Sequence, residues 1–488
     1  MTNITRRLGS VAVVTALAWG AAACSDITSV NDNPNGPTSV PPPSILPAAT
    51  QVAVNRVLGV EPNLREGGLW VQYYAQTQYR DEDKYNIRPG APSTPWSTYT
   101  GPLTDFQRMV EMGEAEGVPN WSAVARIMQS WLFGFLTDTF GDIPYSEALG
   151  GDSVATPKYD MQTDVYAGIL STLKQASGEL DPNGIGFDNG DLLYGGDMTK
   201  WRKFANSLRL RMAIHLSNID PATAQAEVQA ALADGVFESN EDNAVLMYLA
   251  ASPNQNPFYL TQVSRPNDYG MSKTLVDTLT SLADPRLPVY ASPNVDSAYV
   301  GLQNGLNDGE GPNISTISRI GALWWTNPAA PFTIQSYAEV LFIKAEAAAR
   351  GWIPDDPATL YTEAIRASMT QYNDALASAG LPTIEDSAID DYLAQPRVQY
   401  NPSTGLEQIA LQKWIALFLN GPEAWTEVRR TGIPHLVPGP RAMLGAIPSR
   451  LPYPTEETVL NEANVAAAIS AQGFKNANDM QTPLRLFK

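Results

Sequence analysis

EQIALQKWIALFLNGPEAWTEVRRTGIPH, residues 407–435, is the stretch that decides the fold. Its first half repeats apolar residues at helical spacing, among them Ile409 and Trp414, and so predicts a helix with one apolar face. We expect Gly421 to end this helix, because glycine adopts the left-handed cap conformation without steric cost. Pro422 suits the first turn of a second helix, where its missing N–H costs nothing. The stretch therefore predicts two helices joined by a very short turn, the unit of helical-repeat folds.

The second helix of this pair is predicted to be structural. Trp425 repeats the apolar face, so we expect both it and Trp414 to be mostly buried. Arg429 and Arg430 fall in the last turn, where positive charge meets the negative end of the helix dipole. Gly432 is expected to end the helix. Nothing in the pair has the pattern of a catalytic site.

Similar helix pairs are predicted along the chain, and they make the fold class all-α with tetratricopeptide-like helix pairs. A pair at 336–350 and 357–373 has small alanines that allow close approach, and it spans about 34 residues, as such repeats do. Residues 240–335 have little helical periodicity and are expected to form a loop-rich lobe, with one short helix at 272–283. We expect one domain over 45–488. The other helices are predicted at 45–59, 64–79, 96–116, 121–137, 162–177, 199–218, 221–234 and from residue 456.

Composition narrows the class of ligand. The chain has 488 residues, of which 44% are hydrophobic, which is ample for a large core. Its formal net charge is -19. Nucleic acid is therefore excluded as a partner, because phosphate binding needs a basic surface. Neutral ligands such as sugars, or peptides, fit this charge better.

The beginning of the chain resembles a bacterial lipoprotein signal. Arg6 and Arg7 precede a short apolar run, and three alanines then lead to Cys24, the single cysteine of the chain. A signal of this kind is cut before the cysteine, which then carries the lipid. We therefore expect a signal peptide at 1–23, a lipid anchor at Cys24 and a proline-rich flexible tether at 24–44. An ordinary signal peptide with a chance cysteine is the alternative.

Several motifs, taken in order, resemble the SusD/RagB family of nutrient-binding outer-membrane lipoproteins, in its SusD-like branch. They are DTFGDIPYSEAL (138–149), LYGGDMTKWRKF (193–204), QKWIALFLNG (412–421) and RLPYPTEE (450–457). The resemblance implies a lipid-anchored protein of the outer membrane, on its cell-surface face. Such a protein captures an oligosaccharide, or another nutrient such as a peptide, and delivers it to a SusC-like TonB-dependent transporter. The resemblance implies neither a cofactor nor an enzymatic activity.

Two other function classes stay open. A helical-repeat scaffold or adhesin would have the same pattern of helices. A secreted glycoside hydrolase is disfavoured because none of the metalloprotease, serine-hydrolase or P-loop motifs occurs, although a pair of carboxylates cannot be recognised by sequence. His215 is expected to be a core histidine rather than a catalytic one. No metal site is expected, since the Asp- and Asn-rich loop at 181–197 lacks the closing glutamate of a calcium loop.

Ligand contacts are expected on loops outside the helix pairs, where aromatic rings and planar polar groups occur together. Sugars stack on flat rings, while their hydroxyls need amide, carboxylate or guanidinium partners. We predict at least one of the adjacent tryptophans Trp324 and Trp325 to be exposed in a concave surface near Trp96 or Tyr269. The alternative is that these rings only cover the core. The candidate residues are Tyr79, Arg80, Asp81, Tyr85, Trp96, Asn267, Asp268, Tyr269, Trp324 and Trp325.

Overall fold

The computed structural model describes residues 40–488, and Pro42–Lys488 forms one compact unit. The predicted signal peptide, Cys24 and most of the predicted tether therefore lie outside the described residues. The first described helix, α2 (Pro42–Leu58), begins within the segment predicted as tether. Its first residues are prolines, which the first turn of a helix tolerates because it leaves those N–H groups unpaired.

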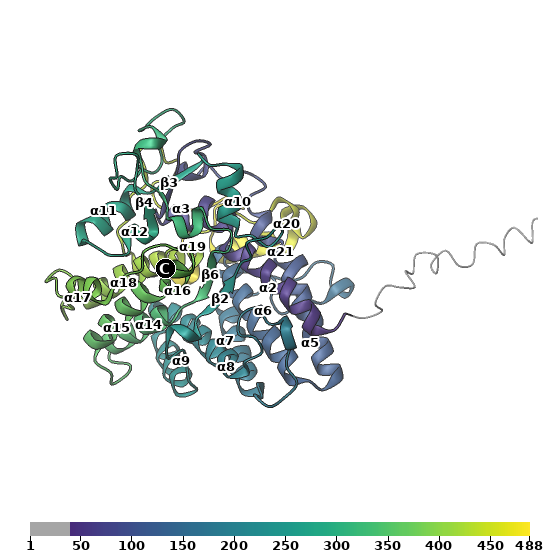
Figure 1. The fold of residues 1–488 in the computed structure, drawn as a ribbon. Coiled ribbons are helices and arrows are strands. Elements are labelled where there is room, and N and C mark those ends of the chain that lie inside the picture. Colours follow the sequence, from purple (N-terminus) through teal and green to yellow (C-terminus); the bar gives the residue numbers. More distant parts are fainter. Residues whose placement is uncertain (1–39) are drawn as a thin grey trace, which may run out of the picture. The chain divides into compact units, whose positions relative to one another are not determined.

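Helices that follow one another in the chain pack side by side (Figure 1). Each helix of one series contacts the next, which is the arrangement expected of helical repeats. The prediction of a mostly helical fold built on helix pairs is confirmed. The series consists of α5 (Thr104–Glu116), α6 (Pro119–Phe140), α7 (Gln162–Glu179), α8 (Met198–His215) and α9 (Pro221–Ala233).

A second group of helices contains the stretch that decides the fold. Helix α14 packs on both α15 and α18, and α18 packs on α19. Trp414 and Trp425 are 1% and 3% exposed, so their predicted burial is confirmed. The group consists of α14 (Tyr337–Ala349), α15 (Pro357–Thr370), α16 (Asn373–Ser378), α17 (Asp386–Leu393), α18 (Gly405–Ala416) and α19 (Gly421–Thr431). The chain ends with α20 (Thr455–Leu460) and α21 (Glu462–Gln472).

The turn between α18 and α19 differs from the prediction. Leu419, with φ 76°, is the residue in the left-handed region, and Gly421 has no positive φ. Gly421 is needed for close packing instead, because a Cβ there would lie 2.6 Å from Gly68 Cα. Its N–H donates to Asn63 Oδ1 at 2.8 Å. Gly432 does take the left-handed cap conformation at the end of α19, with φ 72°, as predicted.

The lobe predicted at 240–335 contains short helices and five of the six strands of the described chain. These strands form three two-stranded antiparallel pairs: β1 with β3, β2 with β6 and β4 with β5. The strands are β1 (Tyr74–Gln76), β2 (Ala244–Met247), β3 (Tyr269–Met271), β4 (Ala291–Ser292), β5 (Arg319–Ile320) and β6 (Pro331–Gln335). The short helices are α10 (Pro257–Ser264), α11 (Lys273–Leu282), α12 (Leu287–Tyr290) and α13 (Ala322–Trp325).

The helix predicted at 64–79 is wrong. The structure has a short helix α3 (Gly67–Trp70), a left-handed residue at Gln72 with φ 60°, and then strand β1. Pairing of β1 with β3, which lies almost 200 residues later, replaces the hydrogen bonds that a continuous helix would have made. Within the described residues, no helix is long and apolar enough to cross a membrane.

Candidate ligand-binding site

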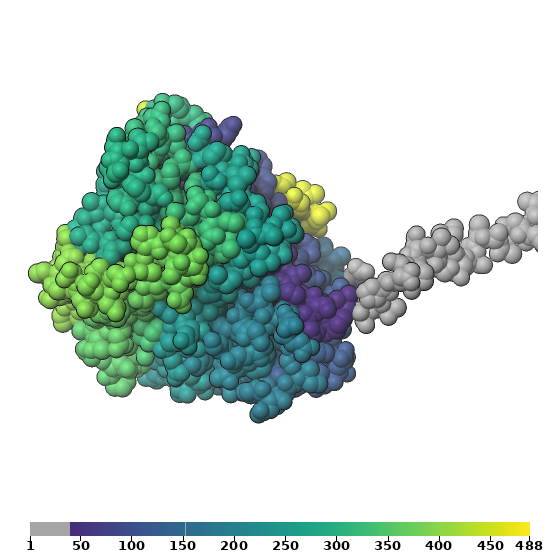
Figure 2. Space-filling model, in the orientation of Figure 1, coloured from purple at the N-terminus to yellow at the C-terminus, as the bar shows by residue number. Residues whose placement is uncertain are grey.

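An open pocket of about 700 Å³ lies where the segment after β1 meets the segment before β3. Figure 1 shows β3 and α3 in the upper part of the molecule. In Figure 2, purple atoms from the early part of the chain reach the surface there, next to the teal atoms of the lobe. The pocket is lined by Arg65, Gln76, Gln78, Tyr79, Asp81, Glu82, Arg88, Ser264, Arg265, Pro266, Asn267, Asp268, Tyr269 and Asp308.

The strand pairing explains why these two segments meet. Gln76 is paired with Tyr269 at the end of the ladder, and the Thr77 N–H donates to Asp268 O at 2.9 Å. The residues just after β1 and just before β3 are therefore held together. Parts of the two loop stretches predicted to carry the ligand site therefore line one pocket, although about 190 residues separate them in the chain.

Tyr79 is the exposed aromatic ring of the pocket. The residue is 68% exposed, and its backbone is in the left-handed region with φ 54°. That conformation is unfavourable for a bulky residue, and strained residues of this kind concentrate at binding sites. The residue is exposed in the lining of the pocket, where an apolar face of a ligand can stack on its ring.

Guanidinium groups of the same pocket are paired with carboxylates. Arg65 binds Glu61 at 2.7 Å, and Arg88 binds both Glu61, at 3.1 Å, and Glu82. Gln76 Nε2 donates to the other oxygen of Glu82 at 2.9 Å. These contacts fix the planar groups of the pocket wall in place, so that they can receive ligand hydroxyls without first being ordered.

Asp83 lies behind this wall and is 2% exposed. Its carboxylate accepts from Asn304 Nδ2 at 2.7 Å and from the N–H of Gln76 at 3.3 Å. Burial raises the pKa of Asp83 to about 7. The hydrogen bond from Asn304 lowers this pKa, but its effect is smaller than that of burial. The carboxyl group therefore holds the end of β1 to the segment around Asn304 rather than contacting a ligand.

Arg80 is not a lining residue, although it was a candidate. It is 3% exposed, and its guanidinium donates to Thr77 O, Asn307 O and Glu310 O at 2.8–3.0 Å. Arg80 was predicted to contact a ligand directly, but its guanidinium does not line the pocket. Its hydrogen bonds instead hold the loop that carries Asp308 at the rim of the pocket.

The adjacent tryptophans Trp324 and Trp325 are 0% and 5% exposed, so the prediction that one of them is exposed is wrong. They form the short helix α13, which other elements enclose on both sides. Trp324 Nε1 donates to Pro331 O at 3.2 Å, and its ring packs edge-on against Phe418. The Trp325 ring faces the guanidinium of Arg319. Neither ring lines the pocket.

Trp96 and Tyr85 also lie outside the pocket. Trp96 is half-buried and packs against Tyr99, Phe140 and Tyr453, so its ring belongs to the core. Tyr85 is 5% exposed. The pocket therefore brings together five of the ten candidates: Tyr79, Asp81, Asn267, Asp268 and Tyr269.

Several lining residues were missed by sequence reasoning. Gln76 and Gln78 alternate along the chain as side chains on one face of a strand do, a signal hidden by the incorrect helix prediction. Arg65, Arg265 and Asp308 have no local pattern that distinguishes them from ordinary surface residues, and only the tertiary fold places them together.

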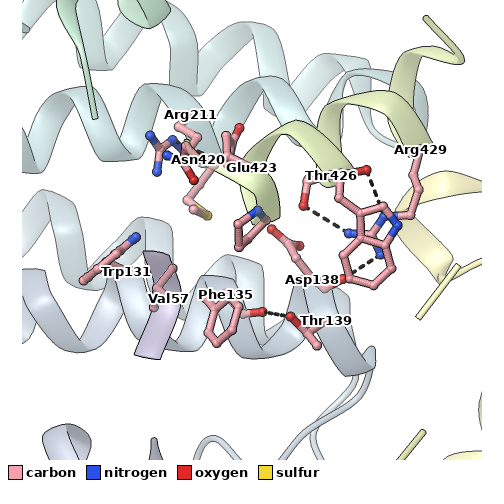
Figure 3. Close-up of a pocket in the computed structure, with 13 residues that line it drawn as sticks. Val57, Trp131, Phe135, Asp138, Thr139, Arg211, Asn420, Glu423, Thr426 and Arg429 are labelled. Carbon is pink, nitrogen blue, oxygen red and sulfur yellow. Dashed lines mark hydrogen bonds and ion pairs between the residues drawn. The ribbon is translucent and has the colours of Figure 1, made fainter. Parts of the chain in front are cut away.

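A second cavity, drawn in Figure 3, lies in the helical core and measures about 20 Å³, room for about one water molecule. Its arginines already have partners within the protein: Arg211 Nε donates to Glu339 at 2.6 Å, and Arg429 donates to Asp138 O at 2.7 Å. The cavity is too small and too well satisfied to accept a sugar.

His215, fully buried beside this cavity, is confirmed as a core histidine. Its ring nitrogens bind Tyr166 and Glu423, both at 2.9 Å. His215, Glu423 and Glu427 converge as metal ligands would. However, Glu427 is already bound to Arg430 at 2.7 Å, and Glu423 to His215. Both carboxylates are thus already paired within the protein.

Comparisons with known proteins agree with the fold. The SusD-like family described as "Starch-binding associating with outer membrane" matches residues 34–454. No curated protein matches the chain.

Solved structures resemble the whole described domain. A chitin-binding protein is 31% identical, with a TM-score of 0.81 over 91% of this chain and 99% of its own. A SusD homolog from Bacteroides fragilis is 29% identical, with a TM-score of 0.78 over 92% of this chain and 100% of its own. A SusD-like protein of the Bacteroidetes is 26% identical, with a TM-score of 0.80 over 92% and 100%. The chain therefore belongs to this SusD-like family.

Proposed function

We propose that this protein binds an oligosaccharide in the 700 Å³ pocket between β1 and β3 and delivers it to a SusC-like TonB-dependent transporter. The observation that carries the proposal is the exposed ring of Tyr79 beside fixed amide, carboxylate and guanidinium groups. A pyranose ring has apolar C–H faces and a rim of hydroxyls. The ring of Tyr79 can take the apolar face, while the polar wall takes the hydroxyls.

The first ligand to test is an oligosaccharide of β-1,4-linked N-acetylglucosamine. A solved structure that is 31% identical over 91% of this chain is named a chitin-binding protein. The amide side chains of Gln78 and Asn267 in the pocket are of the type that pairs with an N-acetyl group, since they offer both donors and an acceptor.

The lipid anchor at Cys24 and the position at the cell surface belong to the same proposal. Family membership supports association with the outer membrane. Diacyl attachment at Cys24 would hold the binding domain there through a tether. The protein acts by binding and not by catalysis, and the scaffold or adhesin alternative predicts no affinity for soluble glycans.

Titration calorimetry with N-acetylglucosamine hexasaccharide tests the proposal. Tyr79→Ala should weaken binding by about 1–2 kcal/mol through loss of stacking. Tyr79→Phe keeps the ring and should bind nearly as the wild type does. Both variants should unfold as the wild type does, because the side chain is mostly exposed. Equal affinity of Tyr79→Ala and the wild type would refute the assignment of the pocket, and no binding in a broad glycan screen would favour the scaffold.

A further inference from the structure

We infer that the pocket accepts uncharged glycans and rejects chains that carry uronate or sulfate groups. This inference rests on the proposed function and names the chemical class of its ligand. It follows from the charge pairing of the residues that line the pocket.

The three arginines that line the pocket are already neutralised by carboxylates of the protein. Arg65 and Arg88 share Glu61, at 2.7 Å and 3.1 Å, and Arg88 also binds Glu82. Arg265 lies 3.6 Å from Asp268, whose second oxygen accepts from Gln78.

An anion-binding site needs the opposite arrangement. Carboxylate and sulfate groups are recognised by arginines whose forked donors are free of internal partners, because the ligand must supply the counter-charge. An acidic glycan in this pocket would have to compete with Glu61, Glu82 and Asp268 for each guanidinium. An uncharged hydroxyl can accept from an unused N–H of a paired arginine without breaking the pair.

The side chains that line the pocket carry one more negative than positive charge, since Asp81, Glu82, Asp268 and Asp308 face three arginines. Asp308 is exposed at the rim and has no hydrogen bond or ion pair from its side chain to another described residue. Asp81, with its side chain 56% exposed, has only a 3.4 Å contact with Lys84. The whole chain has a formal net charge of -19, so the field outside the pocket also repels anions.

Two hexasaccharides of equal length separate the alternatives: one of N-acetylglucosamine alone, and one that alternates N-acetylglucosamine with glucuronate. For the wild-type lipidated chain or its soluble form from residue 25, we expect the acidic hexasaccharide to bind at least tenfold more weakly. Its relative affinity should rise with salt, since screening weakens the repulsion.

A charge variant identifies the cause. Asp268→Asn frees Arg265, and Asp308→Asn removes the unpaired charge. Each change removes one unit of negative charge at about 6 Å, which is worth roughly threefold in a water-like dielectric. The double variant should therefore raise the ratio of acidic to neutral affinity about tenfold. Glu363→Gln, on the exposed face of α15, is the matched control and should leave the ratio unchanged.

The outcomes distinguish this inference from the proposed function. If the acidic hexasaccharide binds the wild type as tightly as the neutral one, and Tyr79→Ala weakens the binding of both, the pocket stands and the charge selectivity is wrong. If the double variant and Glu363→Gln change the ratio equally, the pocket charges do not set the selectivity and the inference is also overturned. If neither hexasaccharide nor any other glycan binds, the proposed function itself fails.

Discussion

Replacing Gly421 by alanine should destabilise the fold where α19 meets α3. A Cβ at this position would lie 2.6 Å from Gly68 Cα and 2.7 Å from Asn63 Oδ1, and closer still to the Gly68 nitrogen. Two of these atoms are backbone and cannot rotate away. Overpacking costs about 1–3 kcal/mol where side chains can adjust, so we expect the upper end here. Loss of the bond from the Gly421 N–H to Asn63 would add about 1 kcal/mol.

Two other glycines separate this steric cost from conformational effects. Gly432→Ala places a Cβ in open space but at φ 72°, which should cost about 1–2 kcal/mol. Gly178, near the end of α7, has open space for a Cβ and no positive φ. Gly178→Ala should therefore stabilise the fold slightly, by up to about 1 kcal/mol. The assay is unfolding in urea, monitored by tryptophan fluorescence. The urea midpoints of the variants are compared, provided that the dependence of the unfolding free energy on urea concentration is the same in each. The reasoning is refuted if Gly421→Ala costs less than Gly432→Ala.

Further predictions concern the core, the pH dependence, the pocket and the anchor. Trp414→Ala should cost about 3–5 kcal/mol by leaving a cavity, and an unchanged thermal midpoint would contradict this. Burial raises the pKa of Asp138 to about 6, so its contribution to stability is complete below about pH 3.9 and is lost as pH rises through 6. The free energy of unfolding of the wild type should therefore fall between pH 4 and 7, and in Asp138→Asn this fall should be smaller by up to about 3 kcal/mol. The same dependence of the unfolding free energy on pH in both proteins would contradict this prediction. Tyr79→Gly should relieve the left-handed strain and keep stability within about 1 kcal/mol of wild type while it weakens glycan binding, so a large loss of stability would mean that the ring is structural. Cys24→Ala should give a folded protein that no longer partitions with membranes in a host without the transporter, as fractionation would show.

The helical framework could be predicted because its signals are local. The apolar periodicity around Trp414 and the capping residue Gly432 both act within one or two turns of the chain. The role of Gly421 could not be predicted, because it depends on the approach of Gly68, more than 350 residues earlier in the chain. Strand β1 was missed for the same reason, since its hydrogen-bond partners lie in β3.

The candidate site was predicted in part. Loops rich in polar and aromatic residues were recognised, and pairing of β1 with β3 brings Tyr79 and Asn267 to one pocket. Composition cannot tell which aromatic rings face solvent. One of Trp324 and Trp325 was expected to be exposed because adjacent tryptophans in an irregular segment cannot easily both face inward. Both are buried, because α13 is enclosed by packing that the sequence around it does not encode. The arginines of the wall are dispersed in sequence and become a group only in the fold.

A crystal structure of the protein with N-acetylglucosamine hexasaccharide tests the central claim most directly. The account predicts a sugar ring in van der Waals contact with the ring of Tyr79, about 3.5–4.0 Å away, and sugar hydroxyls bonded to the polar wall that contains Gln78 and Asn267. Sugar density at any other surface, with the pocket between β1 and β3 holding only solvent, would contradict it.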